Sequence, residues 1–136
     1  MKTIEVISIP VTNQEESKQF YMKLGFEVIV EAPMGNGRTW IQLGMPNQVT
    51  TITLVSWWPY KEVVMPAGSL QGIILETDDI EKEVQELKTK GIKVGTMGTK
   101  GFEAGKIDNT LWGKFAYLND PDGNGLSIHQ FITNKS

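Results

Sequence analysis

The first quarter of this chain recurs without a gap at a shift of 66 residues. Val11-Thr12-Asn13 aligns with Thr77-Asp78-Asp79, and the segment 24–28 aligns with 90–94. Each copy has the pattern of a short apolar strand, a polar helix start, a one-sided helix, a glycine and a second strand. A single βαβ-like unit cannot bury its own apolar face. The repeat therefore predicts two modules that close over shared space.

The first copy predicts a strand at 4–11, where apolar side chains alternate with the others. Asn13 followed by Glu16 forms a capping-box pattern that opens a helix, and the helix continues through Leu24 to a stop at Gly25. Gly35-Asn36-Gly37 predicts a tight turn. Further strands are predicted at 26–30, 39–43 and 50–56.

The second copy repeats this order. A strand at 72–77 precedes Asp78 or Asp79 as the helix cap, and Gly91 ends the helix. The helix stripe is Ile80, Val84 and Leu87. After the helix we expect a strand beginning at 92–94. The glycine-rich stretch 95–113 that follows is expected to include a mobile loop, with Phe102 as a lid residue. The last two strands are expected at 114–119 and 125–131, joined by the turn 120–124.

These elements predict an α+β fold of two βαβββ modules. The first module covers 1–57, a linker covers 58–69 and the second module covers 70–136. A chain of 136 residues is long enough for the modules to share one structural domain with a proper core.

Composition excludes several classes of function. A net charge of −3 without a basic patch argues against nucleic acid as a partner. The absence of cysteine excludes disulfides, thiolate zinc sites and a cysteine nucleophile. No apolar run approaches the roughly 18 residues of a membrane span, and Glu5 and Pro10 interrupt the apolar start. We expect a cytoplasmic protein with no membrane partner.

Two motifs carry a family resemblance: Phe20-Tyr21-x-x-Leu24-Gly25-Phe26 near the start and Asp120-Pro121-Asp122-Gly123-Asn124 near the end. With them the chain resembles the vicinal oxygen chelate superfamily, which groups glyoxalase I, bleomycin-resistance proteins and extradiol dioxygenases. The resemblance implies two βαβββ modules whose curved mixed sheets form a cup. It also implies a homodimer.

In the metalloenzymes of this superfamily, ligands come from the first and last strands of each module. The resemblance places those four positions at Val6, Thr53, Gly72 and Ser127. Valine and glycine have no side-chain donor, and hydroxyls hold a divalent ion poorly. We therefore expect no metal and no cofactor, and we assign no catalytic residue.

Seven residues are the candidates for ligand binding. Tryptophan offers a large rigid surface for stacking and one hydrogen-bond donor. His129 is the only imidazole, and strand alternation places it on the same face as Ser127, while Glu76 is a candidate counter-charge for a cationic ligand. Each of these positions also has a structural interpretation, such as a module junction for Trp57 or a solvated strand end for Glu76. The full set is Trp40, Gln42, Trp57, Glu76, Trp112, Ser127 and His129.

The function we expect is metal-independent binding of a small aromatic or amphipathic molecule, as in the bleomycin-resistance branch that the chain resembles. A second hypothesis is a lyase, isomerase or dioxygenase that holds one divalent metal ion through the atypical ligands Glu5, Gln71, Glu76 and His129. A third is a cup packed shut by side chains, which would leave a module that binds a partner protein or is purely structural. Metal content separates the first two hypotheses, and the effect of ligands on thermal stability separates the third.

Overall fold

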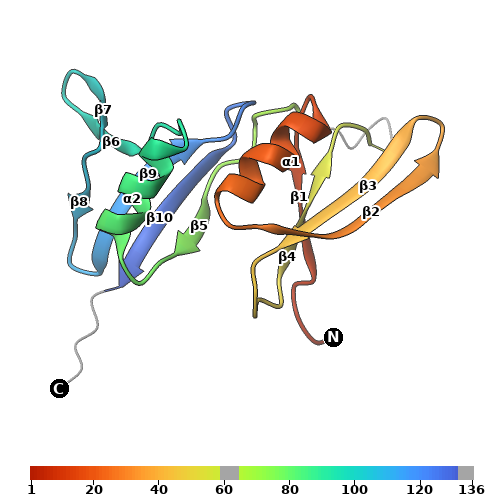
Figure 1. Ribbon diagram of the computed structural model, residues 1–136, viewed down its shortest axis with the longest axis horizontal. Coiled ribbons are helices and arrows are strands. Elements are labelled where there is room, and N and C mark those ends of the chain that lie inside the picture. The colour runs from red at the N-terminus through yellow and green to blue at the C-terminus, as the bar shows by residue number, and fades with distance from the viewer. Residues whose placement is uncertain (59–64, 132–136) are drawn as a thin grey trace. The chain divides into compact units, whose positions relative to one another are not determined.

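A computed structural model describes residues 1–58 and 65–131 of the chain (Figure 1). It divides into two compact units, the first formed by 1–70 with 120–124 and the second by 71–119 with 125–136. Residues 59–64 of the predicted linker lie outside the described residues. That the two modules share one structural domain stays a prediction. No helix in the described ranges has the length and apolar content needed to cross a membrane.

The first unit is a four-stranded mixed sheet with one helix. Its sheet order is β1-β4-β3-β2, in which β1 runs parallel to β4 and the other pairs are antiparallel. The helix contacts β4, and Ile9, Leu43 and Leu54 are buried in the core. The elements are β1 (Val6–Pro10), α1 (Gln14–Lys23), β2 (Glu27–Gly35), β3 (Arg38–Gly44) and β4 (Thr51–Val55).

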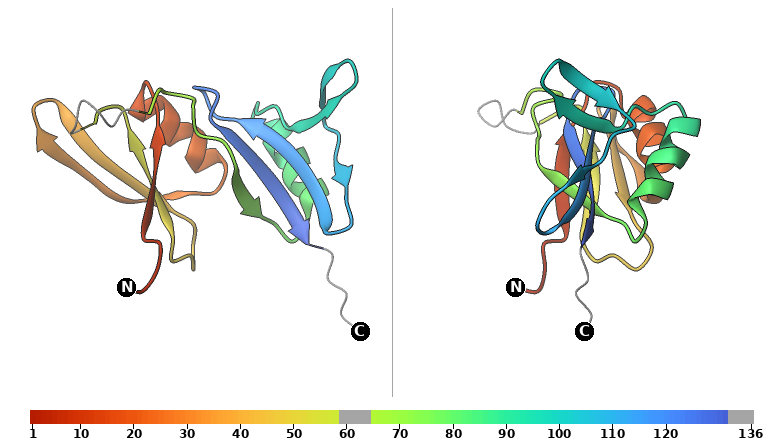
Figure 2. Two further views of the ribbon diagram at one scale, coloured as in Figure 1. Left: turned by 180° about the vertical axis from the view of Figure 1, so that it is seen from behind. Right: turned by 90° about the vertical axis from the view of Figure 1, so that its left-hand side faces the viewer.

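The second unit repeats this plan with additional strands. Its central order is β5-β10-β9-β6-β7, with β8 also paired to β9, and β5 runs parallel to β10. The helix lies in front of β9 and β10 in Figure 1, and the view from behind in Figure 2 shows the other face of these strands. The elements are β5 (Ile73–Glu76), α2 (Ile80–Thr89), β6 (Gly95–Gly98), β7 (Gly101–Ala104), β8 (Asp108–Asn109), β9 (Gly113–Asn119) and β10 (Gly125–Phe131).

Both helices begin at the predicted side-chain caps. The Asn13 side chain accepts a hydrogen bond from the backbone N–H of Glu16, and the Asp79 side chain accepts one from the N–H of Lys82. Asp79, rather than Asp78, is therefore the second cap. Each cap satisfies one of the N–H groups that the first helical turn leaves without a partner.

Both helices also end alike, at the predicted glycines. Gly25 and Gly91 have φ values of +110° and +79°. In the first repeat the N–H of Phe26 donates to the Tyr21 carbonyl, and in the second the N–H of Ile92 donates to the Leu87 carbonyl. These are Schellman motifs, which need a residue with positive φ after the last helical residue.

One predicted strand begins later than expected. The strand expected to begin at 92–94 begins at Gly95, because the N–H of Ile92 is engaged in the Schellman motif. The glycine-rich stretch that follows is not a loop throughout, since β6 and β7 pair from Gly95↔Ala104 to Gly98↔Gly101. Phe102 lies in β7 of this hairpin rather than in a loop.

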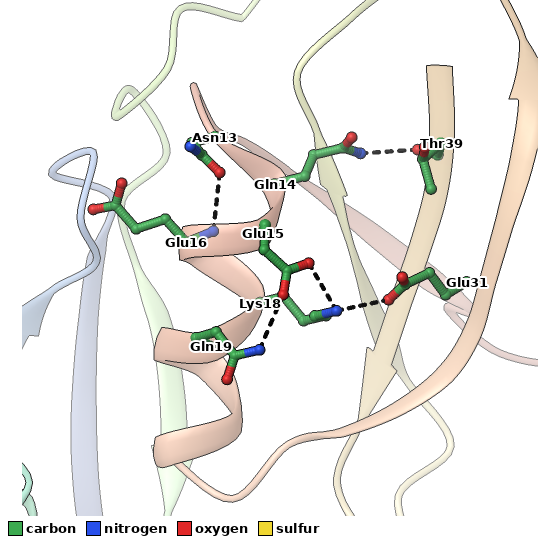
Figure 3. A network of polar contacts seen from close by, with 8 residues as sticks. All are labelled: Asn13, Gln14, Glu15, Glu16, Lys18, Gln19, Glu31 and Thr39. Atoms are coloured by element: carbon green, nitrogen blue, oxygen red, sulfur yellow. Dashed lines mark hydrogen bonds and ion pairs between the residues drawn. The ribbon is translucent and has the colours of Figure 1, made fainter. Parts of the chain in front are cut away.

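The start of α1 is tied to the edge of the first sheet (Figure 3). The Lys18 ammonium group lies 2.8 Å from Glu15 and 3.0 Å from Glu31 of β2, and the Gln14 side chain donates to the carbonyl of Thr39 on β3. Gln14 also donates to the carbonyl of Leu54 on β4. The helix is therefore fixed to three strands by polar contacts as well as by the core.

The turn between β9 and β10 belongs to the first unit. Within that unit, the buried Tyr21 phenol donates to Oδ2 of Asp120 over 2.8 Å, and the Asn124 amide donates to the same oxygen and to the Pro10 carbonyl. Asn124 also accepts from the N–H of Leu70. Burial raises the pKa of the Tyr21 phenol well above its ordinary value, and the Asp120 carboxylate raises that pKa further.

Candidate functional site

The candidate residues fall into both compact units. Trp40 and Gln42 lie next to each other on one face of β3, as the sequence predicts. Trp40 Nε1 donates to Gln42 Oε1 over 3.1 Å, and Gln42 Nε2 donates to the Thr51 hydroxyl over 2.9 Å. That hydroxyl donates in turn to the Glu5 carbonyl. The chain of bonds fixes the half-buried indole of Trp40 against rotation.

Trp57 lies just after β4 in the same unit. The guanidinium carbon of Arg38 lies 5.1 Å from the centre of its ring, within the range of a cation–π contact. The indole Nε1 of Trp57 is buried and has no hydrogen-bond partner. The structure thus adds Arg38 to the surroundings of Trp57.

In the second unit, His129 lies at the centre of a group of aromatic rings. It is 5% exposed, stacks on Phe115 with ring centres 4.1 Å apart and 15° between the planes, and meets Phe131 edge-on at 4.1 Å. Its Nε2 atom is buried without a partner. An alanine Cβ at Gly113 would lie 2.9 Å from Nε2, so the absence of a side chain at Gly113 makes room for the imidazole.

Register places two more candidates on the face of His129. Glu76 of β5 is its direct partner, and Ser127 lies two residues before it on β10. This confirms the predicted shared face of Ser127 and His129, and the register adds Glu76 to it. Glu76 is exposed and Ser127 is buried. Their role in binding stays a prediction.

Trp112 is 69% exposed at the tip of the turn between β8 and β9. The Thr110 hydroxyl organises this turn, because it accepts from the N–H groups of Trp112 and Gly113 and donates to the Gly113 carbonyl. The Trp112 side chain is therefore exposed to solvent, while the backbone of its turn is held by hydrogen bonds.

The sheet of the second unit has an open face opposite α2, which we call the aromatic face. The helix side buries Ala116, Leu118, Leu126 and Ile128. On the aromatic face Tyr117 is 43% exposed, Phe131 is 57% exposed and Ile74 is 59% exposed. By strand register, the members of the aromatic face are Ile74, Met97, Phe102, Phe115, Tyr117, His129 and Phe131.

Of these seven members only His129 was among the predicted ligand-binding residues, and the missed ones include the three rings of Phe115, Tyr117 and Phe131. The signal was present, because Phe115 and Tyr117 alternate with Ala116 and Leu118 along β9. Both sets are apolar, so the alternation alone does not say which one faces the helix. The register with β10 decides it, since Phe115 is the direct partner of His129.

The four positions that the family resemblance implies for metal ligands hold no group that suits a divalent ion. The Thr53 hydroxyl donates to the Ile41 carbonyl, and Val6 and Gly72 have no side-chain atom that can bind a metal ion. Within residues 1–58 and 65–131, no three histidine, aspartate or glutamate side chains gather closely enough to hold a metal.

Each unit combines one helix with a mixed sheet, which is the α+β architecture that the sequence predicts. A model of the Glyoxalase/Bleomycin resistance protein/Dioxygenase superfamily matches residues 3–128. The chain belongs to this superfamily.

Individual members of known sequence or structure are similar over almost the whole chain. TnmS3, an antibiotic binding protein from Streptomyces sp. CB03234, is 32% identical with a TM-score of 0.80, covering 97% of this chain and 98% of its own. A glyoxalase/bleomycin resistance protein from the same organism is 34% identical with a TM-score of 0.72, covering 92% and 97%. The uncharacterized protein YwkD of Bacillus subtilis (strain 168) is 31% identical over 135 residues, 96% of this chain and 98% of YwkD.

Proposed function

We propose that this protein binds a small planar aromatic or amphipathic molecule without a metal ion, and that it works in the cytoplasm as a homodimer. The observation that carries the proposal is the aromatic face. It presents stacked rings and exposed apolar side chains around His129, whose Nε2 lacks a partner. Aromatic surface with few polar atoms is the usual lining of a small-molecule site.

Two further observations support binding rather than chemistry. Trp40 and Gln42 are held by hydrogen bonds and His129 by ring stacking, so these candidate side chains are already ordered before a ligand binds. The similarity to TnmS3, an antibiotic binding protein, extends over both repeats. Antibiotics are therefore the class of ligands to screen first.

The test is thermal unfolding with a panel of planar aromatic antibiotics, run with and without a chelator. We expect at least one compound to raise the unfolding temperature equally with and without the chelator. We also expect that compound to be recovered chemically unchanged after incubation with the protein. Tyr117→Ala should reduce the shift because it removes a ring from the aromatic face. Met34→Ala, which truncates an exposed residue of β2 in the other unit, is the matched control. No shift with any compound, or a shift that the chelator abolishes, would contradict the proposal.

One observation favours the metal-dependent alternative. Glu76 and His129 are direct neighbours across β5 and β10, and both are possible ligands. Two donors fall short of the three protein ligands that catalytic zinc sites usually supply. Elemental mass spectrometry of untagged protein, grown with added nickel, zinc, manganese and iron, tests this alternative. About one equivalent of metal per chain, lost in Glu76→Ala and His129→Ala, would establish it.

A further inference from the structure

The aromatic face carries two carboxylates at opposite ends of one row. Across the strands β5, β10, β9 and β8, the register runs from Glu76 to His129, then Phe115, then Asp108. Residues that are direct partners in a sheet share a face. Because neighbouring strands lie about 4.8 Å apart, the α-carbons of Glu76 and Asp108 are about 14 Å apart. The stacked rings of His129 and Phe115 lie between them.

Among residues 1–58 and 65–131, no basic side chain pairs with either carboxylate. Lys114, the strand lysine next to Phe115, is on the helix side of β9 and lies 2.6 Å from Glu81 of α2. Among the described strand residues of the second unit that share the aromatic face, none is lysine or arginine. Within 1–58 and 65–131, neither Glu76 nor Asp108 forms an ion pair. In the part of the chain that the structure describes, the face therefore combines apolar rings with two carboxylates that form no ion pair.

The geometry points to a planar aromatic cation as the ligand of this face, an inference that rests on the proposed function and specifies its ligand. Tyr117 is 43% exposed, and its ring lies nearly parallel to that of Phe115 at 10°. Such rings bind flat aromatic molecules by stacking and attract positive charge through their π electrons. Glu76 or Asp108 supplies the counter-charge.

Three tricyclic probes of similar shape and different charge test the inference by isothermal titration calorimetry at pH 8. The probes are proflavine, a cation; acridine, which is neutral; and acridine-9-carboxylate, an anion. We expect proflavine to bind at least tenfold more tightly than acridine, and the anion to bind most weakly. Raising NaCl should weaken proflavine alone, because salt screens the attraction between exposed charges.

Three substitutions assign the effect to the two carboxylates. Glu76→Gln and Asp108→Asn remove one charge each at nearly constant shape, and each should weaken proflavine roughly threefold to tenfold while leaving acridine unchanged. Glu103→Gln is the matched control, because Glu103 is an exposed acid of β7 on the opposite face of the same sheet. It should change neither probe.

The outcomes separate this inference from the proposed function. If all three probes bind equally, or if Glu103→Gln weakens proflavine as much as Glu76→Gln does, the charge preference is wrong and aromatic binding stands. If none of the probes and none of the antibiotics binds, both proposals fail. If Glu76→Gln and Asp108→Asn change the molar mass in light scattering and not proflavine binding, a second copy of the chain covers the face, and the inference is overturned.

Discussion

Replacing Tyr21 with phenylalanine tests the buried polar cluster at the turn 120–124. Tyr21 is fully buried and Asp120 is 5% exposed, so water cannot replace the lost O–H donor. Asp120 Oδ2 would keep the Asn124 amide at 2.7 Å, and Oδ1 would keep two backbone N–H donors. Since one donor of four is lost from a buried carboxylate, we expect Tyr21→Phe to lower the free energy of unfolding by about 2 kcal/mol.

The penalty should shrink at high pH, and the sign follows from the raised pKa of Tyr21. Below pH 10 the phenol is protonated in both the folded and the unfolded state. Above pH 10 the unfolded state loses the proton while the folded state keeps it, so wild-type stability falls by about 1.4 kcal/mol per pH unit. Tyr21→Phe lacks this loss. Its penalty should therefore fall from about 2 kcal/mol at pH 7.5 to about 0.5 kcal/mol at pH 11.

The assay is urea unfolding followed by tryptophan fluorescence at both pH values. Tyr117→Phe is the matched control, because its ring lies 43% exposed on the aromatic face and its change should stay within about 0.5 kcal/mol. Two results would refute the reasoning: equal penalties for the two substitutions at pH 7.5, or a Tyr21→Phe penalty that does not change with pH.

Two further predictions concern the backbone. Gly113→Ala should destabilise the protein by roughly 2–4 kcal/mol, because φ is +151° and the new Cβ would collide with the Gln130 carbonyl oxygen. Gly37→Ala is the control, since Gly37 also has a positive φ but has open space around it. It should lower the free energy of unfolding by only about 1 kcal/mol in the same urea assay. Asp79→Ala should cost about 1 kcal/mol through loss of the α2 cap, whereas equal loss in Asp78→Ala would mean that capping is not the cause.

Local chemistry made much of the fold predictable. The caps Asn13 and Asp79 and the stops Gly25 and Gly91 depend only on neighbouring residues, and all four appear where the sequence predicts helix ends. The turn at 35–37 is similar, since Asn36 and Gly37 have φ values of +56° and +73°. Such features are written into a few adjacent residues, so sequence patterns reveal them.

Features set by distant pairing were harder to predict. Residues 92–94 have the composition of a strand, yet the Schellman motif engages Ile92 first. The hairpin of β6 and β7 is rich in glycine, and glycine is rare in strands. The sequence pattern of this hairpin is therefore typical of a loop. The candidate site was only partly predictable for the same reason. Alternation along single strands suggested the faces of Glu76 and His129. That Phe115 and Asp108 lie in one row with them follows only from the register of three strand pairs.

The turn 120–124 packs in the first unit, although it comes late in the sequence, and this has a consequence for folding during synthesis. Ribosomes release the chain from its first residue onward, so the β1–α1 region emerges long before the turn does. Tyr21 meets its acceptor on Asp120 after another 99 residues, and the Pro10 carbonyl waits still longer for Asn124. The first repeat therefore cannot complete its buried hydrogen bonds until the turn 120–124 has been made. A truncation that removes this turn should for that reason damage the much earlier β1–α1 region.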